Sequence, residues 1–316
     1  MAQMDTLVTT RIGADYIDFW AELARETGDP EAYYNWAHCY EKSGEFSEGL
    51  IVIREMLKLP LPNEWQVKGI FLKAIFEKDT PNTAWATIQK CNMDVSPVLR
   101  GKIHSQRGRI QKDRRKYDEA ILEYTAAAIY WEGNDHLIGH TWNNLAGLYI
   151  KKGQYDDAHQ AVDKAIALWS DYEYLPHAHD QKALILIEEK RYAEALVYSR
   201  KSFAGIENKH RWRAEFFCTL ALALAGTDQY SQALIEIENS FKVYDYLGDS
   251  KPKIKAFAAR KKMFEVMHER SDIRGIEYAL EISRGELRKA ARHLDVNHSA
   301  LLGAMKRRAI KYKHSK

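Results

Sequence analysis

Histidines and cysteines are the residues of this sequence that most readily support metal binding or catalysis. Among the twelve histidines, His136 and His140 lie four residues apart, which places both imidazoles on one face of a helix. A metal site would need a cysteine, aspartate or glutamate at a matching spacing, and we find none. His177 and His179 are two residues apart and would point to different faces of a helix. We therefore predict no metal site.

The three cysteines are Cys39, Cys91 and Cys218, which are too far apart in sequence for a metal knuckle or a redox pair. Buried free thiols in a reducing compartment are the simplest interpretation. The sequence also lacks a phosphate-binding loop, a dinucleotide fingerprint, a nucleophile elbow and a zinc-protease motif. We therefore expect no catalytic residues, no cofactor and no enzymatic activity.

The composition predicts a globular protein. The 316 residues are 46% hydrophobic and 29% charged, which is enough apolar content for a sizeable core. No stretch approaches the roughly 20 apolar residues in succession that a membrane-spanning helix needs. The first residues, MAQMDTLVTTRIGADYIDFW, lack the basic start, the apolar segment and the cleavage site of a secretory signal. These features predict a cytoplasmic protein that does not associate with membranes.

Charge is distributed unevenly along the chain. The net charge is +3, yet residues 284–316 contain ten lysines and arginines against Glu286 and Asp295, a net +8 that leaves −5 for the preceding residues. A basic end on a mildly acidic body is typical of a protein that contacts a polyanion through that end. A solvated tail that only aids solubility is the alternative, and charge alone does not separate the two.

The body of the chain is repetitive. In TWNNLAGLYIKKGQYDDAHQAVDKAIAL, Trp142, Leu145, Ala146 and Tyr149 have the spacing W-x2-L-A-x2-Y, and small and aromatic residues follow in a fixed order. The same order recurs at intervals of about 34 to 38 residues. Aligned on the small residue of the first helix, the copies fall at Ala37, Ala74, Gly108, Ala146, Ala183 and Ala221.

This pattern resembles the tetratricopeptide repeat, a pair of antiparallel helices of about 34 residues. A small residue where two helices cross lets their axes approach, and the aromatic residue after the turn fills the wedge between them. The resemblance implies an all-α fold, a right-handed superhelical solenoid of about six helix pairs, over residues 30–250. The weakest copy lies around Ala74 and Ala86.

Helices are also predicted on both sides of the repeats. An apolar stripe from Tyr16 to Leu23, ahead of the stop signal Gly28-Asp29-Pro30, predicts an N-terminal capping helix within residues 1–29. After the break YLGDSKP, residues 251–283 are predicted to form an atypical helix pair that caps the solenoid or makes a dimer surface.

In tetratricopeptide proteins the first helix of each repeat lines a concave groove, and the resemblance assigns positions 2, 5, 9 and 12 of each repeat to it. Asparagine can bond a peptide backbone and arginine can hold a carboxylate with two hydrogen bonds, so we predict a peptide or protein ligand. A polar surface without a ligand is the alternative. The two-lysine, two-asparagine clamp of the chaperone-binding members is not at matching positions. The predicted groove residues are Arg109, His140, Asn143 and Asp180.

Residues 284–316 predict two short helices joined by a turn. Leu287, Ala290, Ala291 and Leu294 give the first helix an apolar side, and Asp295-Val296-Asn297 ends it. Asn297 or Ser299 can cap the second helix. A small core is predicted from Leu294, Val296, Leu301 and Met305. A helix-turn-helix with basic residues outside is an arrangement that binds DNA.

The order of residues in this segment is similar to the Fis-type helix-turn-helix of bacterial enhancer-binding activators and of the factor for inversion stimulation. The similarity is carried by Ala290, Ala291, Leu294, Val296, Leu301, Met305, Lys306, Arg307 and Ile310. It implies that the second helix enters the major groove of DNA while the first helix and the flanks hold phosphates.

The match departs from the Fis-type pattern on its reading helix. Where the family usually has Thr, Arg and Lys, this sequence has Ala300, Leu302 and Gly303, and Asp295 replaces the turn glycine. The second helix therefore has few side chains that could contact bases directly. The predicted base contacts are Asn297, His298 and Ser299, and the predicted phosphate contacts are Arg288, Lys289, Arg292, Lys306, Arg307 and Arg308.

These features together predict a cytoplasmic transcriptional regulator. Residues 284–316 would bind DNA, the groove would bind a peptide or protein partner, and a homodimer through residues 251–283 would enlarge the small footprint of one helix-turn-helix. The alternative is an adaptor that binds a protein partner through the groove and does not bind DNA.

Overall fold

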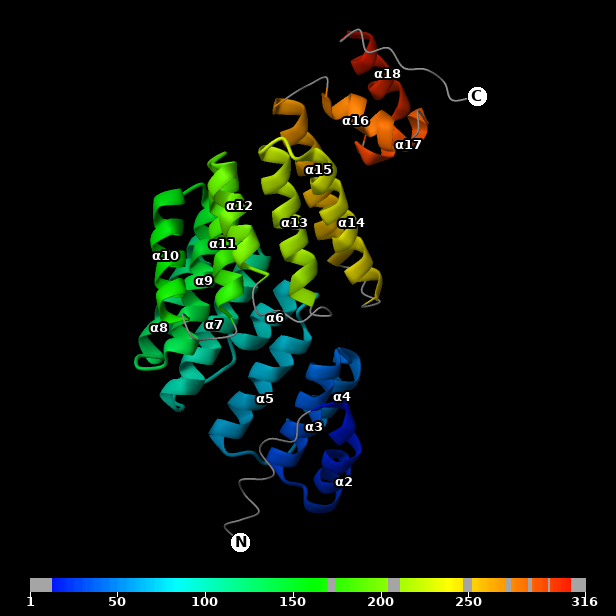
Figure 1. Ribbon diagram of the computed structural model, residues 1–316. Helices are drawn as coiled ribbons and strands as arrows, with labels where there is room; N and C mark the ends of the chain where they lie inside the picture. The colour runs from blue at the N-terminus through cyan, green and yellow to red at the C-terminus, as the bar shows by residue number, and fades with distance from the viewer. Residues whose placement is uncertain are drawn as a thin grey trace. The chain divides into compact units, whose positions relative to one another are not determined.

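The computed structural model describes residues 13–169, 174–203, 211–246, 252–270, 274–283, 286–294 and 296–307. Within these ranges every regular element is a helix (Figure 1), which confirms the predicted all-α fold. The chain divides into two compact units, Met1–Lys152 and Gly153–Lys316. None of the described helices combines the length and the apolar character needed to cross a membrane.

Unit 1, the residues up to Lys152, is built from helix pairs. The second helix of each pair packs on the first, so that α3 meets α4, α5 meets α6 and α7 meets α8, and α5 also contacts α3 and α7. The elements are η1 (Ala14–Tyr16), α2 (Ile17–Thr27), α3 (Pro30–Ser43), α4 (Phe46–Met56), α5 (Asn63–Phe76), α6 (Pro81–Ile88), α7 (Pro97–Asp113), α8 (Tyr117–Tyr130) and α9 (Asp135–Lys152).

The helix predicted near the N-terminus is α2, and its boundary with α3 follows from local chemistry. Gly28 ends α2 in the left-handed conformation, with φ of 67°. The carboxylate of Asp29 then accepts a hydrogen bond of 3.0 Å from the backbone N–H of Glu31, and Pro30 occupies the first helical position of α3. Trp20 of α2 is almost fully buried, so this helix covers one face of α3.

The turns inside the helix pairs share one backbone device. A left-handed residue stands seven positions after the aligned small residue in five copies. The residue that follows it donates its N–H to a carbonyl five positions back, as Lys116 does to Gln111 and Arg191 to Leu186, at 2.9 and 2.8 Å. Two of the five left-handed residues are glycine and three are not: Gly44, Arg115, Gly153, Lys190 and Asp228.

Small residues bring the paired helices close together, as predicted. Within the pair α7 and α8, a Cβ atom added to Gly108 would lie 2.9 Å from the ring of Tyr124, and between neighbouring pairs one added to Gly49 of α4 would lie 2.4 Å from the ring of Phe76 of α5. In the second copy, however, the buried small residue of the second helix is Ala84, whereas Ala86 is exposed. The weakest copy nevertheless lies where it was predicted, because α5 contains Ala74 and α6 contains Ala86.

Unit 2, the residues from Gly153 onward, continues the pattern and then changes it. The described helices are α10 (Tyr155–Leu168), α11 (Leu175–Glu188), α12 (Tyr192–Lys201), α13 (Arg211–Gly226), α14 (Tyr230–Tyr246), α15 (Pro252–Arg270), α16 (Arg274–Ile282), α17 (Leu287–His293) and α18 (His298–Arg307).

The region predicted as an atypical pair, residues 251–283, is divided between two cores. Helix α15 lies beside α13 and α14 (Figure 1), and its Ala256, Met263 and Met267 are fully buried in the core that those helices share. Helix α16 instead shares a separate apolar core with α17 and α18. The C-terminal unit of structure is therefore three helices, α16 to α18, which we call the three-helix head.

Candidate functional site

The predicted groove residues of unit 1 lie on first helices, Arg109 on α7 and both His140 and Asn143 on α9. Burial by itself would raise the pKa of Glu41 on α3, but His38, Lys42 and Arg109 together hold it below its usual range. Arg109 therefore lies near Glu41, although α5 stands between their helices in the packing order. Polar side chains from the first and third helix pairs thus approach each other.

Two of these side chains have unused hydrogen-bonding atoms. Nη2 of Arg109 and Oδ1 of Asn143 are shielded from solvent and make no hydrogen bond within the described part of the chain. Buried polar atoms are normally paired, and an unpaired one costs about 1–3 kcal/mol. Arg109 and Asn143 are themselves partly exposed, so each first helix carries an accessible polar side chain with one unused atom turned inward.

His140 contributes a neutral ring to this region. Burial, with a smaller contribution from the nearby His136, lowers the pKa of His140 to about 4, so its imidazole is uncharged at neutral pH. The rings of His136 and His140 lie edge to face, with 4.7 Å between their centroids. No group of three or more potential metal ligands occurs among the residues that the structure describes.

Sequence reasoning did not single out three residues of the same surface. Tyr34, His38 and Glu41 occupy positions 5, 9 and 12 of the first copy, so the repeat register that selected Arg109 could also have selected them. Nδ1 of His38 lies 3.0 Å from Oε2 of Glu41. Burial and the Glu41 charge raise the pKa of Tyr34 to about 12, and its ring packs edge-on against Trp65.

Asp180 is not part of an accessible surface. Its side chain belongs to α11, and the residue is only 6% exposed, because α13 packs against this helix. The prediction that Asp180 lines an open groove is therefore wrong. The repeat register identified its helix face correctly, but the register does not show that a neighbouring helix covers this position.

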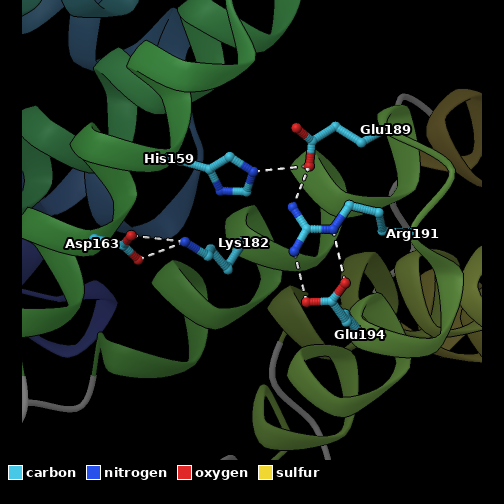
Figure 2. Close-up of polar contacts among 6 residues, drawn as sticks. All are labelled: His159, Asp163, Lys182, Glu189, Arg191 and Glu194. Atoms are coloured by element: carbon cyan, nitrogen blue, oxygen red, sulfur yellow. Dashed lines mark hydrogen bonds and ion pairs between the residues drawn. The ribbon is translucent and has the colours of Figure 1, made fainter.

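Ion pairs join the second helix of one pair to the next pair in unit 2. Figure 2 shows His159 and Asp163 of α10 facing residues of α11 and α12. Nε2 of His159 lies 2.9 Å from Glu189, which also accepts a hydrogen bond of 3.1 Å from Arg191. Nearby, Lys182 of α11 donates to both carboxylate oxygens of Asp163, at 2.7 and 2.8 Å. Arg191 also binds Glu194 with two hydrogen bonds, so this network fastens helices together rather than presenting free groups.

The three-helix head has its own apolar core. Leu301 and Met305 of α18 are 1% and 4% exposed, and they pack with Leu287 of α17 and Leu280 of α16. Val296 was also expected in this core, but it is 41% exposed in the turn, and residues of α16 fill that space instead. The segment predicted as a helix-turn-helix therefore shares its core with a preceding helix, α16, that the sequence analysis had assigned elsewhere.

The basic residues predicted to meet phosphates are partly described. Arg288, Lys289 and Arg292 are exposed on α17, and Ser299 is exposed near the start of α18. The carbonyl of Asn297 accepts the hydrogen bond from Leu301 N–H that begins α18, so Asn297 holds the predicted capping position. Arg308 and the side chains of His298, Lys306 and Arg307 lie outside the described residues.

The three-helix head also contacts the helices before it. Leu294 at the end of α17 packs against both the head core and the large core of unit 2. Burial lowers the pKa of His293, while Glu238 of α14 raises it and Arg260 of α15 lowers it. The C-terminal end of α17 therefore faces α14 and α15.

The comparisons with known proteins agree with this architecture. Residues 139–168 match a family model described as a tetratricopeptide repeat. No curated protein matches the chain. Among solved structures, the chain is similar to one from the APC/C hetero-tetramer Cut9-Hcn1, with 14% identity and a TM-score of 0.60 over 89% of this chain and 52% of that one. This chain thus spans about half the length of that protein.

Two further structures match over most of their length. One is a Rap protein complexed with competence and sporulation factor, with 10% identity and a TM-score of 0.58 over 84% of this chain and 77% of that one. The other is the Rap conjugation gene regulator of the plasmid pLS20 in complex with the Phr* peptide, with 12% identity and a TM-score of 0.56 over 95% and 98%. Identities this low show the fold alone. The chain is a tetratricopeptide-like helical repeat protein, and its matched repeat is residues 139–168.

Proposed function

We propose that the protein is an interaction module that binds an extended peptide or protein segment on the first helices of unit 1. The observation that carries this proposal is the pair of unused polar atoms, Nη2 of Arg109 and Oδ1 of Asn143, on helices whose repeat positions face the groove in tetratricopeptide proteins. An arginine donor and an amide acceptor suit a peptide backbone or a carboxylate. Two proteins of similar fold are described in complexes, one with the Phr* peptide and one with competence and sporulation factor, and the first supports the same class of ligand.

The test begins with a peptide array, and the affinities of the selected peptides are then measured by fluorescence anisotropy. We expect Arg109→Ala to weaken binding by about 10- to 100-fold, since a hydrogen bond to a charged group contributes about 1.5–3 kcal/mol. Asn143→Ala should weaken it by about 2- to 10-fold, since a neutral hydrogen bond contributes about 0.5–1.5 kcal/mol. Arg54→Ala is the matched control, because Arg54 is exposed on the second helix of the first pair. Peptides that bind all three variants equally would contradict the assignment of the surface.

A second candidate function is DNA binding by the three-helix head. One structural observation favours it: the helix-turn-helix segment closes a core of its own, and Arg288, Lys289 and Arg292 remain exposed together on α17. Cations on one helix suit a row of phosphates, whereas the exposed Leu302 on α18 does not suit base reading. We therefore propose a phosphate-dominated contact with little sequence preference, in a cytoplasmic regulator.

Salt dependence tests the DNA proposal. Binding of the full chain to duplex DNA should weaken steeply as salt rises, because each neutralised phosphate releases condensed counterions. Replacing both Arg288 and Arg292 by alanine should reduce the slope of log K against log salt by about 2, whereas replacing the exposed arginines Arg54 and Arg200 should leave it unchanged. Sedimentation of the free and DNA-bound chain tests the proposed homodimer. If the full chain does not bind duplex DNA at low salt, the DNA proposal is wrong and only the adaptor function is left.

A further inference from the structure

Asp180 is a buried carboxyl group with an incomplete set of hydrogen bonds. It lies on α11 and is 6% exposed, and its Oδ1 atom has no hydrogen-bond partner within the described ranges. The hydroxyl of Thr219 on α13, itself 3% exposed, lowers the pKa of Asp180, but it already donates to the backbone carbonyl of Glu215 at 3.4 Å. A carboxylate in such a place has lost most of its hydration, and one neutral donor does not replace it.

Charged groups from two neighbouring helices act on Asp180 in opposite directions. Glu215, one turn before Thr219 on α13, brings a second negative charge. Lys255 of α15 brings a positive charge, but its Nζ atom is already 2.8 Å from Oε1 of Glu215. Lys255 therefore neutralises Glu215 first and compensates only part of the cost of a charge on Asp180.

Other ionisable groups lie in the same interfaces. His177 of α11 packs against Trp212 and Phe216 of α13, with ring centroids 3.9 and 5.3 Å apart, and Glu188 of α11 pairs with Lys262 of α15. Cys218 of α13 lies 3.1 Å from the hydroxyl of Ser240 on α14, and burial raises the pKa of this thiol to about 12, so it remains neutral. His179 of α11 is influenced by Lys201 of α12. The facing groups of α10 are His159 and Asp163, which pair with Glu189 and Lys182.

The balance of these effects determines when Asp180 ionises. Burial is the largest effect and, together with the charge of Glu215, it outweighs Thr219 and Lys255, so that the pKa of Asp180 rises to about 7. The ordinary pKa of this carboxyl is 3.8, and an open state that exposes the side chain would restore that pKa. Below about pH 4 the carboxyl is neutral in both states. Between about pH 4 and 7 the carboxyl is ionised in the open state but still protonated in the packed state. Acid therefore favours the packed state, and this stabilisation is lost as pH rises towards 7.

We propose that Asp180 makes the contact of α11 with α13 and α15 a proton-sensitive joint, packed tightly when the carboxyl is neutral and loosened when it is ionised. Ionisation places a negative charge beside Glu215 in a site with little water, and separating the helices restores hydration to both groups. Because α15 also contacts α16 and faces the end of α17, loosening it would alter how the three-helix head is held.

Hydrogen–deuterium exchange measured by mass spectrometry tests this proposal on the full chain. After correction for intrinsic exchange rates, the equilibrium constant for opening of α11, α13 and α15 should increase by up to about tenfold per pH unit between about pH 4 and 7. Above pH 7 it should stay constant. Helices α7 and α8 of unit 1 serve as the internal reference. Asp180→Asn should remove the pH dependence, whereas Asp163→Asn, which alters an exposed carboxylate on α10, should retain it.

Two substitutions at more exposed positions decide the question even if Asp180→Asn does not fold. Glu215→Gln removes the like charge and should lower the pH at which helix opening stops increasing. Lys255→Met removes the compensating positive charge and should raise that pH. Shifts in one common direction, no shift in either variant, or a pH dependence that persists in Asp180→Asn would overturn the proposal. These outcomes do not bear on peptide binding by unit 1.

Discussion

Replacing Gly101 by alanine tests whether close helix contact stabilises the repeats. Gly101 is buried on α7, and a Cβ atom at this position would lie 2.2 Å from Nε1 of Trp131 and 2.7 Å from two further ring atoms. Trp131 follows directly after α8 and is 5% exposed, so the ring has little room to move. Relief therefore requires α7 and α8 to separate or the indole to leave its site.

Two opposing effects decide the magnitude. Alanine favours the helical state over glycine by about 1 kcal/mol, whereas overpacking a well-filled site costs about 1–3 kcal/mol. Because 2.2 Å is far inside normal contact distance, we take the upper end of that range and expect unfolding to become easier by about 2 kcal/mol. For a domain of this size that corresponds to a fall in Tm of about 4–8 °C.

Differential scanning calorimetry and urea unfolding of the full chain measure this change. Thr125→Ala is the propensity control, since Thr125 is exposed on α8 and should gain up to about 0.7 kcal/mol. Trp131→Leu alone should destabilise the protein because it leaves a cavity. The double variant Gly101→Ala with Trp131→Leu should be at least about 1 kcal/mol more stable than the sum of the two single effects predicts. A Tm that rises in Gly101→Ala, or strictly additive effects, would refute the reasoning.

Three further outcomes follow from single residues. Lys190 has a left-handed φ of 61°, so Lys190→Gly should stabilise the chain by about 0.5–1 kcal/mol in urea unfolding, and a loss of stability would count against strain at this turn. Burial raises the pKa of Cys91 to about 11 and that of Cys218 to about 12, so Ellman's reagent at pH 8 should label them only after denaturation, and rapid labelling of the folded chain would contradict this. The pKa of His140 is lowered to about 4 in the folded chain, so folding stability is lost as pH falls from about 6.5 to 4. His140→Gln should therefore make the Tm less sensitive to acid in thermal melts, and an unchanged dependence of Tm on pH would contradict this prediction.

The sequence predicted the repeats because their geometry depends on local contacts. Small residues recur at nearly constant spacing, since each permits the crossing of two helices that are neighbours in sequence; they are Ala37, Ala74, Gly108, Ala146, Ala183 and Ala221. The turns were harder to predict in detail. Arg115, Lys190 and Asp228 adopt the left-handed conformation that glycine adopts in other copies, and at Arg115 and Lys190 no residue preference signals this.

The candidate site was predicted in part. Arg109 and Asn143 came from the repeat register, and the structure places them on first helices with unused polar atoms. The proximity of Glu41 to Arg109 was not predicted, because it links helices separated by a complete pair. Asp180 was assigned to the groove by its repeat position, and only the packing of α13 against α11 shows that it is buried.

The amino-acid sequence by itself determined the all-helical class, the length of the repeat, the start of α3 at Asp29 and Pro30, and the concentration of positive charge near the C-terminus. These features depend on residue spacing and on backbone chemistry within one or two turns. The tertiary structure alone decided that α15 joins the core of α13 and α14, that α16 closes the three-helix head, and that Asp180 is buried beside Glu215. Each of these depends on which helices meet across tens of residues, where apolar faces have several partners of similar chemistry and only the packing of the whole unit selects one.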